Sequence, residues 1–112
     1  MNALPSRRIG PFTVSAVSLG CMNLSHAYGA PPPPAQAEAL LLRALERGVT
    51  MFDTAALYGF GANETLVGRV LKAHRDRFVL ASKGGMAGHR LVPSWLFNSG
   101  SSRSFVGFFF TK

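Results

Sequence analysis

Apolar residues recur along the chain with two different periods, and the two periods alternate. Some short apolar segments are partly β-branched and have the length of buried strands. Other, longer segments space their apolar residues by three and four positions, so that each would form a single stripe when coiled as a helix. Strands are expected at 17–20, 49–55 and 78–82, and helices at 34–47 and 63–74.

Residues that start and stop helices stand at the ends of the two helical segments. Pro34 suits the first turn of a helix, and Gly48 follows the first helix where a left-handed residue is needed. Asn63 is expected to cap the second helix, which would continue to His74. A break at Gly10-Pro11 separates two short β segments ahead of the first main strand.

The order strand, helix, strand, helix, strand is typical of an α/β protein. A repeat of about thirty residues per unit is the length of a βαβ crossover, so the three main strands are expected to be parallel. Parallel sheets carry their chemistry at the carboxyl ends of the strands. Those ends lie at Gly20-Cys21-Met22, Asp53-Thr54-Ala55 and Lys83-Gly84.

Composition narrows the class of protein. Apolar residues make up 47% of 112 residues, enough for a core and against general disorder. The single cysteine excludes an internal disulfide framework and an all-cysteine zinc site, and we expect no metal. Since neither a membrane-spanning segment nor the apolar part of a signal peptide is visible, we expect a cytoplasmic protein without a membrane partner.

The chain is basic, with 12 Lys and Arg against 5 Asp and Glu and a net charge of +7. Such a charge raises nucleic acid as a partner. The basic residues are scattered, however, and the one cluster, 72–77, closes a predicted helix, where cations stabilise the helix dipole. The distribution therefore argues against nucleic-acid binding.

Three residues at the strand ends could perform proton chemistry: Asp53, Tyr58 and Lys83. A phenol has a pKa near 10, and a neighbouring ammonium favours the phenolate, so that the phenol gives up its proton more easily. A carboxylate beside the ammonium keeps it charged and in place. Together the three would form a proton donor for a carbonyl oxygen. The alternative is that the carboxylate caps a turn, the ring covers the core and the ammonium is solvated.

Two longer motifs carry a resemblance to a known family. The first is the run 48–59, Gly-Val-Thr-Met-Phe-Asp-Thr-Ala-Ala-Leu-Tyr-Gly, followed by Gly-Ala-Asn-Glu at 61–64 and by Gly68. The second is the pair of flanking segments Ser-Leu-Gly-Cys-Met at 18–22 and Ala-Ser-Lys at 81–83. Over about residues 7–90 the chain resembles the N-terminal part of the aldo-keto reductases.

The resemblance implies a fold and an activity. The family fold is a (β/α)8 TIM barrel closed at its base by an N-terminal hairpin, which Arg8 to Val14 would supply. This chain would form that hairpin, the first three parallel strands and two helices. Family members are oxidoreductases that reduce aldehydes and ketones to alcohols with NADPH, without a metal. The implied partner is therefore a small carbonyl substrate.

The resemblance also implies roles for individual residues. Tyr58 would be the acid that protonates the carbonyl oxygen, Lys83 would assist it, and Asp53 would pair with Lys83. The backbone at Gly20, Cys21 and Met22, with the Asp53 side chain, would line the nicotinamide ribose. Without the resemblance, we expect Cys21 to be a packed hydrophobe rather than a nucleophile.

The chain departs from the family pattern in two respects. A fourth active-site residue, a histidine after the fourth strand, has no counterpart among His26, His74 and His89. The phosphate and adenine sites that the family builds in the later part of the barrel are not encoded, since a full barrel needs about 250 residues. We therefore expect weak NADPH binding and an inactive chain when it is alone.

The composition changes after residue 90. The last 22 residues hold five of the nine phenylalanines, five serines and no acid, without a useful period. We expect 1–90 to be the barrel portion and 91–112 to be an irregular, disordered tail that adds no strand. A frame change or a premature end of the coding sequence would produce such a break. The alternative function is then a non-catalytic remnant or a small basic interaction protein.

Overall fold

The computed structural model describes residues 3–25, 29–84 and 107–111, the last range by its backbone alone. The strands are β1 (Ser6–Ile9), β2 (Phe12–Ser15), β3 (Leu19–Gly20), β4 (Met51–Asp53), β5 (Val79–Gly84) and β6 (Gly107–Thr111). The helices are α1 (Pro34–Glu46) and α2 (Ala62–Leu71), with short 3-10 segments η1 (Met22–Leu24), η2 (Tyr58–Gly61) and η3 (Lys72–Arg77).

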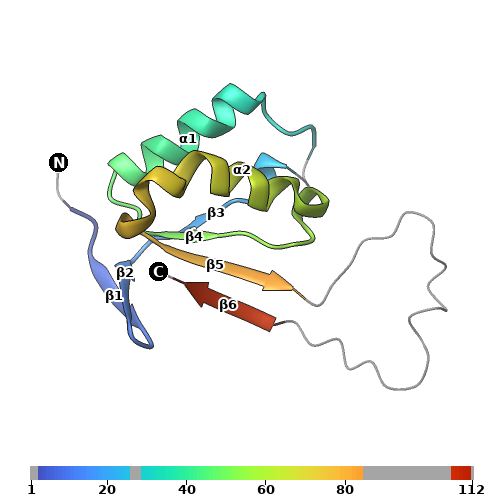
Figure 1. Cartoon of the computed structure of the whole chain (residues 1–112). Helices are drawn as coiled ribbons and strands as arrows, with labels where there is room; N and C mark the ends of the chain where they lie inside the picture. Colours follow the sequence, from blue (N-terminus) through green and yellow to red (C-terminus); the bar gives the residue numbers. More distant parts are fainter. Residues whose placement is uncertain (1–2, 26–28, 85–106, 112) are drawn as a thin grey trace, which may run out of the picture.

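The strands form two sheets. A two-stranded antiparallel hairpin, β1 and β2, precedes a four-stranded sheet in the order β3-β4-β5-β6. β3, β4 and β5 are mutually parallel, as the sequence predicts, with Leu19 opposite Phe52 and Phe52 opposite Leu80. Both helices lie on one face of this sheet, as Figure 1 shows. The described residues therefore form an α/β unit with part of a barrel wall, which does not close into a barrel.

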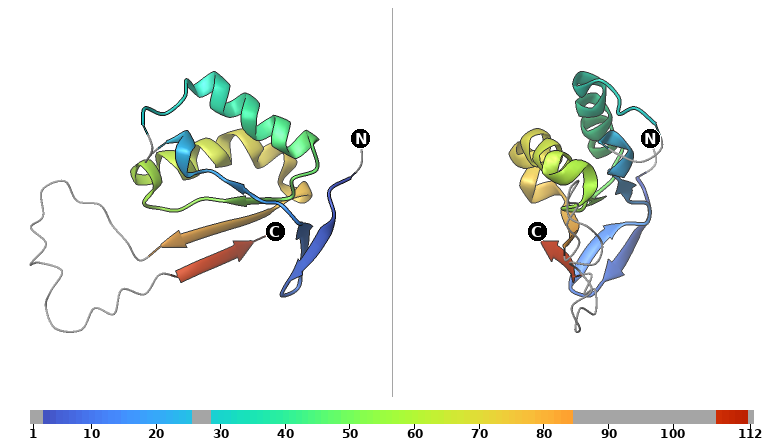
Figure 2. Two further views of the ribbon diagram at one scale, coloured as in Figure 1. Left: turned by 180° about the vertical axis from the view of Figure 1, so that it is seen from behind. Right: turned by 90° about the vertical axis from the view of Figure 1, so that its right-hand side faces the viewer.

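The core lies between the helices and the sheet. Phe52 is completely buried there and meets the ring of Phe78 edge to face, with centroids 5.4 Å apart. Leu41 from α1 and Leu71 from α2 are also completely buried in the same cluster. The view along the helices in Figure 2 shows them on one side of the sheet. The hairpin lies beyond the end of the sheet where β4 and β5 begin, and the Ser15 N–H donates to the Thr50 hydroxyl just before β4.

The helix signals in the sequence are confirmed for α1 but not for α2. Pro34 opens α1, and Gly48 has a φ of +89°, the left-handed value expected after a helix. The expected cap at Asn63 is wrong, because α2 starts at Ala62 after Gly61, and the Asn63 side chain turns instead toward the ends of β3 and β4. The half-buried His74 lies in η3, beyond the end of α2.

The expectation that residues 91–112 add no strand is wrong. Gly107–Thr111 forms β6, which pairs antiparallel with β5 and places Phe108 opposite Lys83 in the register. An edge strand presents a row of unpaired N–H and C=O groups, and antiparallel pairing can satisfy them with any extended, β-prone segment. The expected disorder of the rest of this tail, 91–106, falls on residues outside the described ranges.

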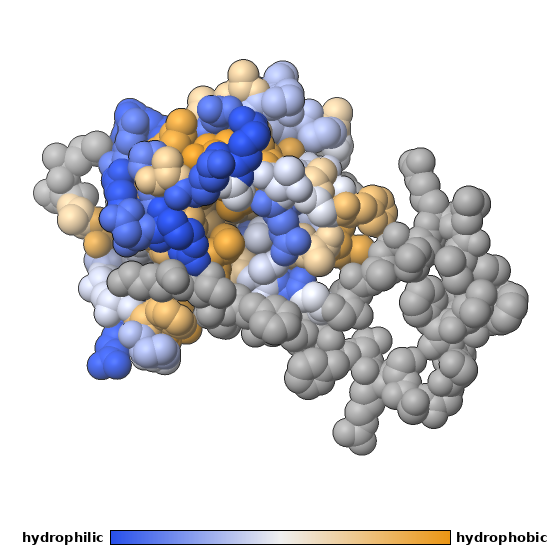
Figure 3. Space-filling model, viewed as in Figure 1, coloured by the Kyte–Doolittle hydropathy of each residue, from blue (hydrophilic) through white to orange (hydrophobic). Residues whose placement is uncertain are grey.

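The basic cluster lies away from the carboxyl ends of the parallel strands. In Figure 3, hydrophilic side chains gather over the end of the helix layer where α1 ends and η3 lies, opposite to the ends of β4 and β5. In the described part of the chain, no helix is both long and apolar enough to cross a membrane.

Candidate active site

Asp53 and Lys83 share one face of the sheet because of the strand register. Phe52 and Leu80 pair across β4 and β5 and pack toward the helices, so Asp53 and Ala81, the next pair, face the other way. Lys83 lies two residues beyond Ala81 and therefore returns to that same face. The sheet thus brings together two residues that are thirty positions apart in the sequence.

The Lys83 ammonium is held by the end of β4. Its Nζ donates to Oδ1 of Asp53 in a charge-assisted hydrogen bond, and it donates a second bond, 3.0 Å long, to the backbone carbonyl of Thr54. The Lys83 side chain is 20% exposed, whereas that of Asp53 is 42% exposed. The pair is therefore open to solvent on the carboxylate side.

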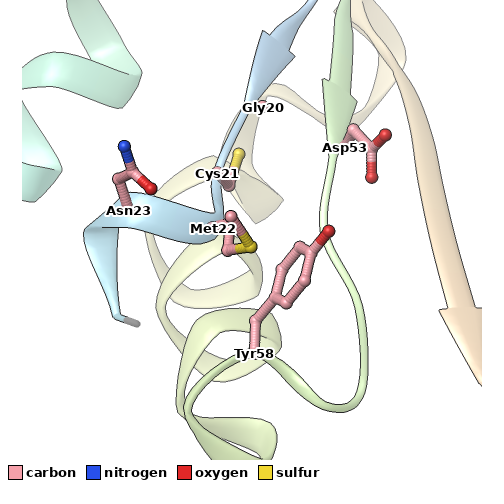
Figure 4. Close-up of a pocket in the computed structure, with 6 residues that line it drawn as sticks. All are labelled: Gly20, Cys21, Met22, Asn23, Asp53 and Tyr58. Carbon is pink, nitrogen blue, oxygen red and sulfur yellow. The ribbon is translucent and has the colours of Figure 1, made fainter. Parts of the chain in front are cut away.

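Tyr58 completes the cluster from the segment above β4. The Lys83 Nζ lies over its ring, 4.9 Å from the centroid, and the Tyr58 hydroxyl points toward Asp53 in Figure 4. The backbone turns sharply after Tyr58, because Gly59 and Phe60 both have left-handed dihedrals, with φ of +58° and +53°. This turn returns the chain to the start of α2 and leaves the phenol over the strand ends.

The surroundings of Lys83 keep it charged. Burial of the ammonium lowers the pKa of Lys83, but hydrogen bonds to Asp53 and Tyr58 and the attraction of both groups outweigh that effect. The pKa of Lys83 consequently lies above its ordinary value of 10.5. A fixed positive charge therefore stands beside the phenol throughout the neutral range.

A pocket of about 310 Å³ opens beside this cluster. Figure 4 shows its walls at the ends of β3 and β4. The lining residues are Gly20, Cys21, Met22, Asn23, Asp53 and Tyr58. Every residue that the family resemblance assigns to catalysis or to the nicotinamide ribose lines this pocket or, in the case of Lys83, adjoins it.

The residues that line the pocket could hold one end of a dinucleotide. A Cβ added at Gly20 would meet nothing within 4 Å, so the wall is open there. The Asp53 carboxylate, 42% exposed, could accept a hydrogen bond from a ribose hydroxyl. The pocket lining in the described residues includes neither lysine nor arginine, and such cations bind phosphates. The lining therefore suits the uncharged nicotinamide and ribose but not a pyrophosphate.

Cys21 contributes shape rather than reactivity. Its side chain is completely buried, as expected for a packed thiol. Burial raises the pKa of Cys21 to about 12, so the thiol stays protonated. The described residues contain no cluster of three or more His, Cys, Asp or Glu that could hold a metal.

Among the described residues, no histidine lines the pocket. His26 and His89 lie outside the described residues, and His74 is not among the residues that line the pocket. The fourth active-site residue of the family thus has no counterpart in the part of the chain that the structure describes.

Sequence reasoning missed the buried hydrogen bonds beneath the site. Asn63 is fully buried and joins the Thr54 hydroxyl to the Cys21 carbonyl. The sequence does hold a signal for these bonds, namely an asparagine that follows the turn after Tyr58. An asparagine at the start of a helix is, however, ordinarily interpreted as a cap. Its long-range partners depend on the tertiary fold.

Comparisons with known proteins agree with this arrangement. The chain is 41% identical over 85 residues to the aldo-keto reductase yakc [NADP(+)] of Schizosaccharomyces pombe, a match that covers 74% of this chain and 25% of that protein. Its structure resembles that of an aldo-keto reductase from Bacillus halodurans in the holo form, with a TM-score of 0.68 and 32% identity over 80% of this chain and 28% of the other. The chain thus spans about a quarter of the length of these relatives.

The family match reaches further along the chain than the motifs do. The model of the Aldo/keto reductase family matches residues 16–103, past the last sequence motif at 81–83 and past residue 90, the expected end of the resemblance. The boundary between a barrel portion and a tail at residue 90 stays a prediction. The family model matches most of the chain, and both the relatives and the fold agree with that match. This chain therefore belongs to the aldo/keto reductase family.

Proposed function

We propose that this chain carries the proton-donating part of an NADPH-dependent oxidoreductase that reduces aldehydes and ketones to alcohols. The observation that supports it best is the Lys83 ammonium, which is bonded to Asp53 and lies over the ring of Tyr58 at the edge of a pocket. The name of the Schizosaccharomyces pombe relative, which includes NADP(+), supports the choice of cofactor.

Each residue has a distinct task in the proposed reaction. When bound, NADPH supplies a hydride to the carbonyl carbon. Tyr58 donates its hydroxyl proton to the carbonyl oxygen, where negative charge develops. Lys83 stabilises the phenolate that remains, and Asp53 together with the Thr54 carbonyl fixes the position of the ammonium. One hydride and one proton convert the carbonyl group to the alcohol.

The pocket walls would hold the nicotinamide end of the cofactor. The backbone at Gly20, Cys21 and Met22 and the Asp53 carboxylate would contact the ribose. The phosphates require groups beyond this lining, so the proposal assigns their binding to parts of a full barrel that the described residues do not form.

A second candidate function is a small, basic, non-catalytic protein. The observation that favours it is β6, which pairs antiparallel with β5 on the edge where a barrel would continue with a parallel strand. The two candidates differ in one respect that can be measured, namely whether these residues support turnover when a complete barrel surrounds them.

A graft tests the proposal. Residues 1–84 would replace the matching N-terminal part of the Schizosaccharomyces pombe relative, and reduction of 4-nitrobenzaldehyde would be followed by NADPH absorbance at 340 nm. We expect turnover within about tenfold of the parent enzyme, since the three reacting side chains are retained. The parent enzyme is the control. A folded graft that binds NADPH but shows no turnover would favour the non-catalytic alternative.

A further inference from the structure

The Asn63 side chain uses all its hydrogen-bonding groups. Its Oδ1 accepts from the Thr54 hydroxyl at 2.6 Å, and its Nδ2 donates to the Cys21 carbonyl at 2.7 Å and to Oγ of Ser25 at 3.0 Å. The residue is 0% exposed. An amide with one accepted and two donated bonds, away from water, is fixed in orientation.

These partners belong to the two strand ends that form the proposed site. Cys21 follows β3 and lines the pocket, and Thr54 follows β4 directly after Asp53. The backbone already joins the two ends once, because the Cys21 N–H donates to the Asp53 carbonyl at 2.8 Å. Asn63 adds a second connection beyond the last backbone bond, where the sheet itself stops.

The connection continues to the ammonium. Thr54 is bonded through its side chain to Asn63 and accepts from the Lys83 Nζ through its backbone carbonyl. The next residue of α2, Glu64, accepts from the Ser82 hydroxyl at 2.5 Å, so the same helical turn also contacts β5. The first turn of α2 therefore contacts the ends of all three parallel strands.

We propose that Asn63 is a positioning residue, which holds the pocket wall after β3 at a fixed distance from the Asp53–Lys83 pair by bridging Cys21 and Thr54. Its importance for catalysis rests on the proposed function. The bridge itself is a property of the fold and can be tested without cofactor or substrate.

Cys21 reports on the bridge in the full 112-residue chain, because it is the only cysteine and is completely buried. Under native conditions, its reaction with Ellman's reagent requires an opening of the fold, and the rate gives the free energy of that opening. The global free energy of unfolding comes from urea titration followed by circular dichroism. The comparison separates a local opening at the bridge from a general loss of stability.

Asn63→Ala removes every bond of the bridge and leaves the Cys21 carbonyl and the Thr54 hydroxyl without this buried partner. We expect labelling of Cys21 to accelerate by about tenfold or more beyond the factor that the loss of global stability predicts. Thr65→Ala is the matched control: it lies in the same turn and loses one exposed bond, to Gly61. For this control, the change in the labelling rate of Cys21 should equal the change that its global stability predicts.

Two further variants separate the bridge from the neighbouring bond to Ser25. Thr54→Val breaks the β4 half of the bridge, so that Asn63 no longer joins the two strand ends; we expect an excess labelling factor of about threefold. Ser25→Ala removes a half-buried partner of Asn63 and should fold, but it leaves both halves of the bridge in place, so labelling of Cys21 should follow global stability. This contrast keeps the test decisive if Asn63→Ala does not fold.

Agreement between labelling and global stability in both Asn63→Ala and Thr54→Val would overturn the proposal, because Asn63 would then be an ordinary core residue. Excess labelling in these variants, together with an inactive graft, would refute the reductase and leave the bridge standing. A failure of the proposed bridge can therefore be distinguished from a failure of the proposed reductase function.

Discussion

Lys83 donates to the Asp53 carboxylate across the boundary between two parallel strands, and this bond joins residues thirty positions apart. The pair has an asymmetric environment, since the Lys83 side chain is 20% exposed and that of Asp53 is 42% exposed. An ion pair with one side in water contributes little to stability. The pair therefore fixes the position of the charge beside Tyr58 more than it stabilises the fold.

Replacing Lys83 tests this view of the pair. Lys83→Met should lower the free energy of unfolding by only about 1 kcal/mol at pH 7, because the exposed carboxylate regains water. Urea titration of the two proteins measures the difference. A loss of several kcal/mol would show that the pair is a structural element of the core.

The pH dependence of this difference follows from the raised pKa of Lys83. The pKa of Lys83 is higher in the folded state than in the unfolded state. The ammonium therefore stabilises the fold fully below about pH 10.5, and this stabilisation disappears as the pH rises through the pKa of the folded state. The difference in the free energy of unfolding between wild type and Lys83→Met should be the same at pH 7 and at pH 9, and it should be smaller at pH 11.5. Arg69→Met, which breaks an exposed pair with Glu38, should show no such decline, because a guanidinium stays charged.

The turn after Tyr58 depends on glycine for two reasons. Gly59 has a φ of +58°, and an added Cβ would lie 3.0 Å from the Ser25 Cβ and 3.2 Å from the Ala62 Cβ. Gly10 has nearly the same φ, +54°, with nothing within 4 Å. Gly59→Ala should therefore destabilise the protein by about 1 to 3 kcal/mol more than Gly10→Ala, measured by urea titration. Equal losses would mean that the loop yields without cost.

The parallel strands and the limits of α1 could be predicted because they depend on local patterns. The stripe on α1, Pro34 and Gly48 act within a few residues of one another. The meeting of Asp53 with Lys83 was also predictable, since parallel strands end on one side of a sheet. In this way periodicity alone predicted that two of the three candidate residues meet.

The bridge at Asn63 and the pairing of β6 could not be predicted, for two different reasons. Two of the three partners of Asn63, Cys21 and Ser25, lie 42 and 38 residues away, and local rules identify only a helix cap. Strand β6 pairs through its backbone, and the sequence 107–111 carries no alternating pattern that would indicate its partner. Main-chain pairing with an open edge depends on what else covers that edge.

Removal of β6 provides a test of that pairing. A chain that ends at residue 106 should lose protection from hydrogen exchange at the β5 amides that face β6, whereas amides of the β1–β2 hairpin should keep theirs. Mass spectrometry of peptic peptides measures both. Unchanged exchange in β5 would show that β6 does not protect this edge in solution.

The 112-residue chain alone should show no measurable NADPH-dependent reduction of 4-nitrobenzaldehyde. Correct positioning of the reactants can supply about 7 to 11 kcal/mol of the barrier, and the described pocket lining holds no cation for the phosphates. Fluorescence titration measures the binding of NADPH, and absorbance at 340 nm measures the reduction. Saturable binding with turnover would mean that residues outside the described range complete the site.

The role of Tyr58 is the central claim, and Tyr58→Phe in the graft tests it most directly. We predict that kcat falls by about 10²-fold or more while the affinity for NADPH, measured by fluorescence, changes by less than about threefold, because the hydroxyl serves only the proton transfer. The control is Phe60→Leu, which replaces an aromatic side chain that is 60% exposed, and it should leave kcat unchanged. A Tyr58→Phe graft that keeps its kcat would contradict the account.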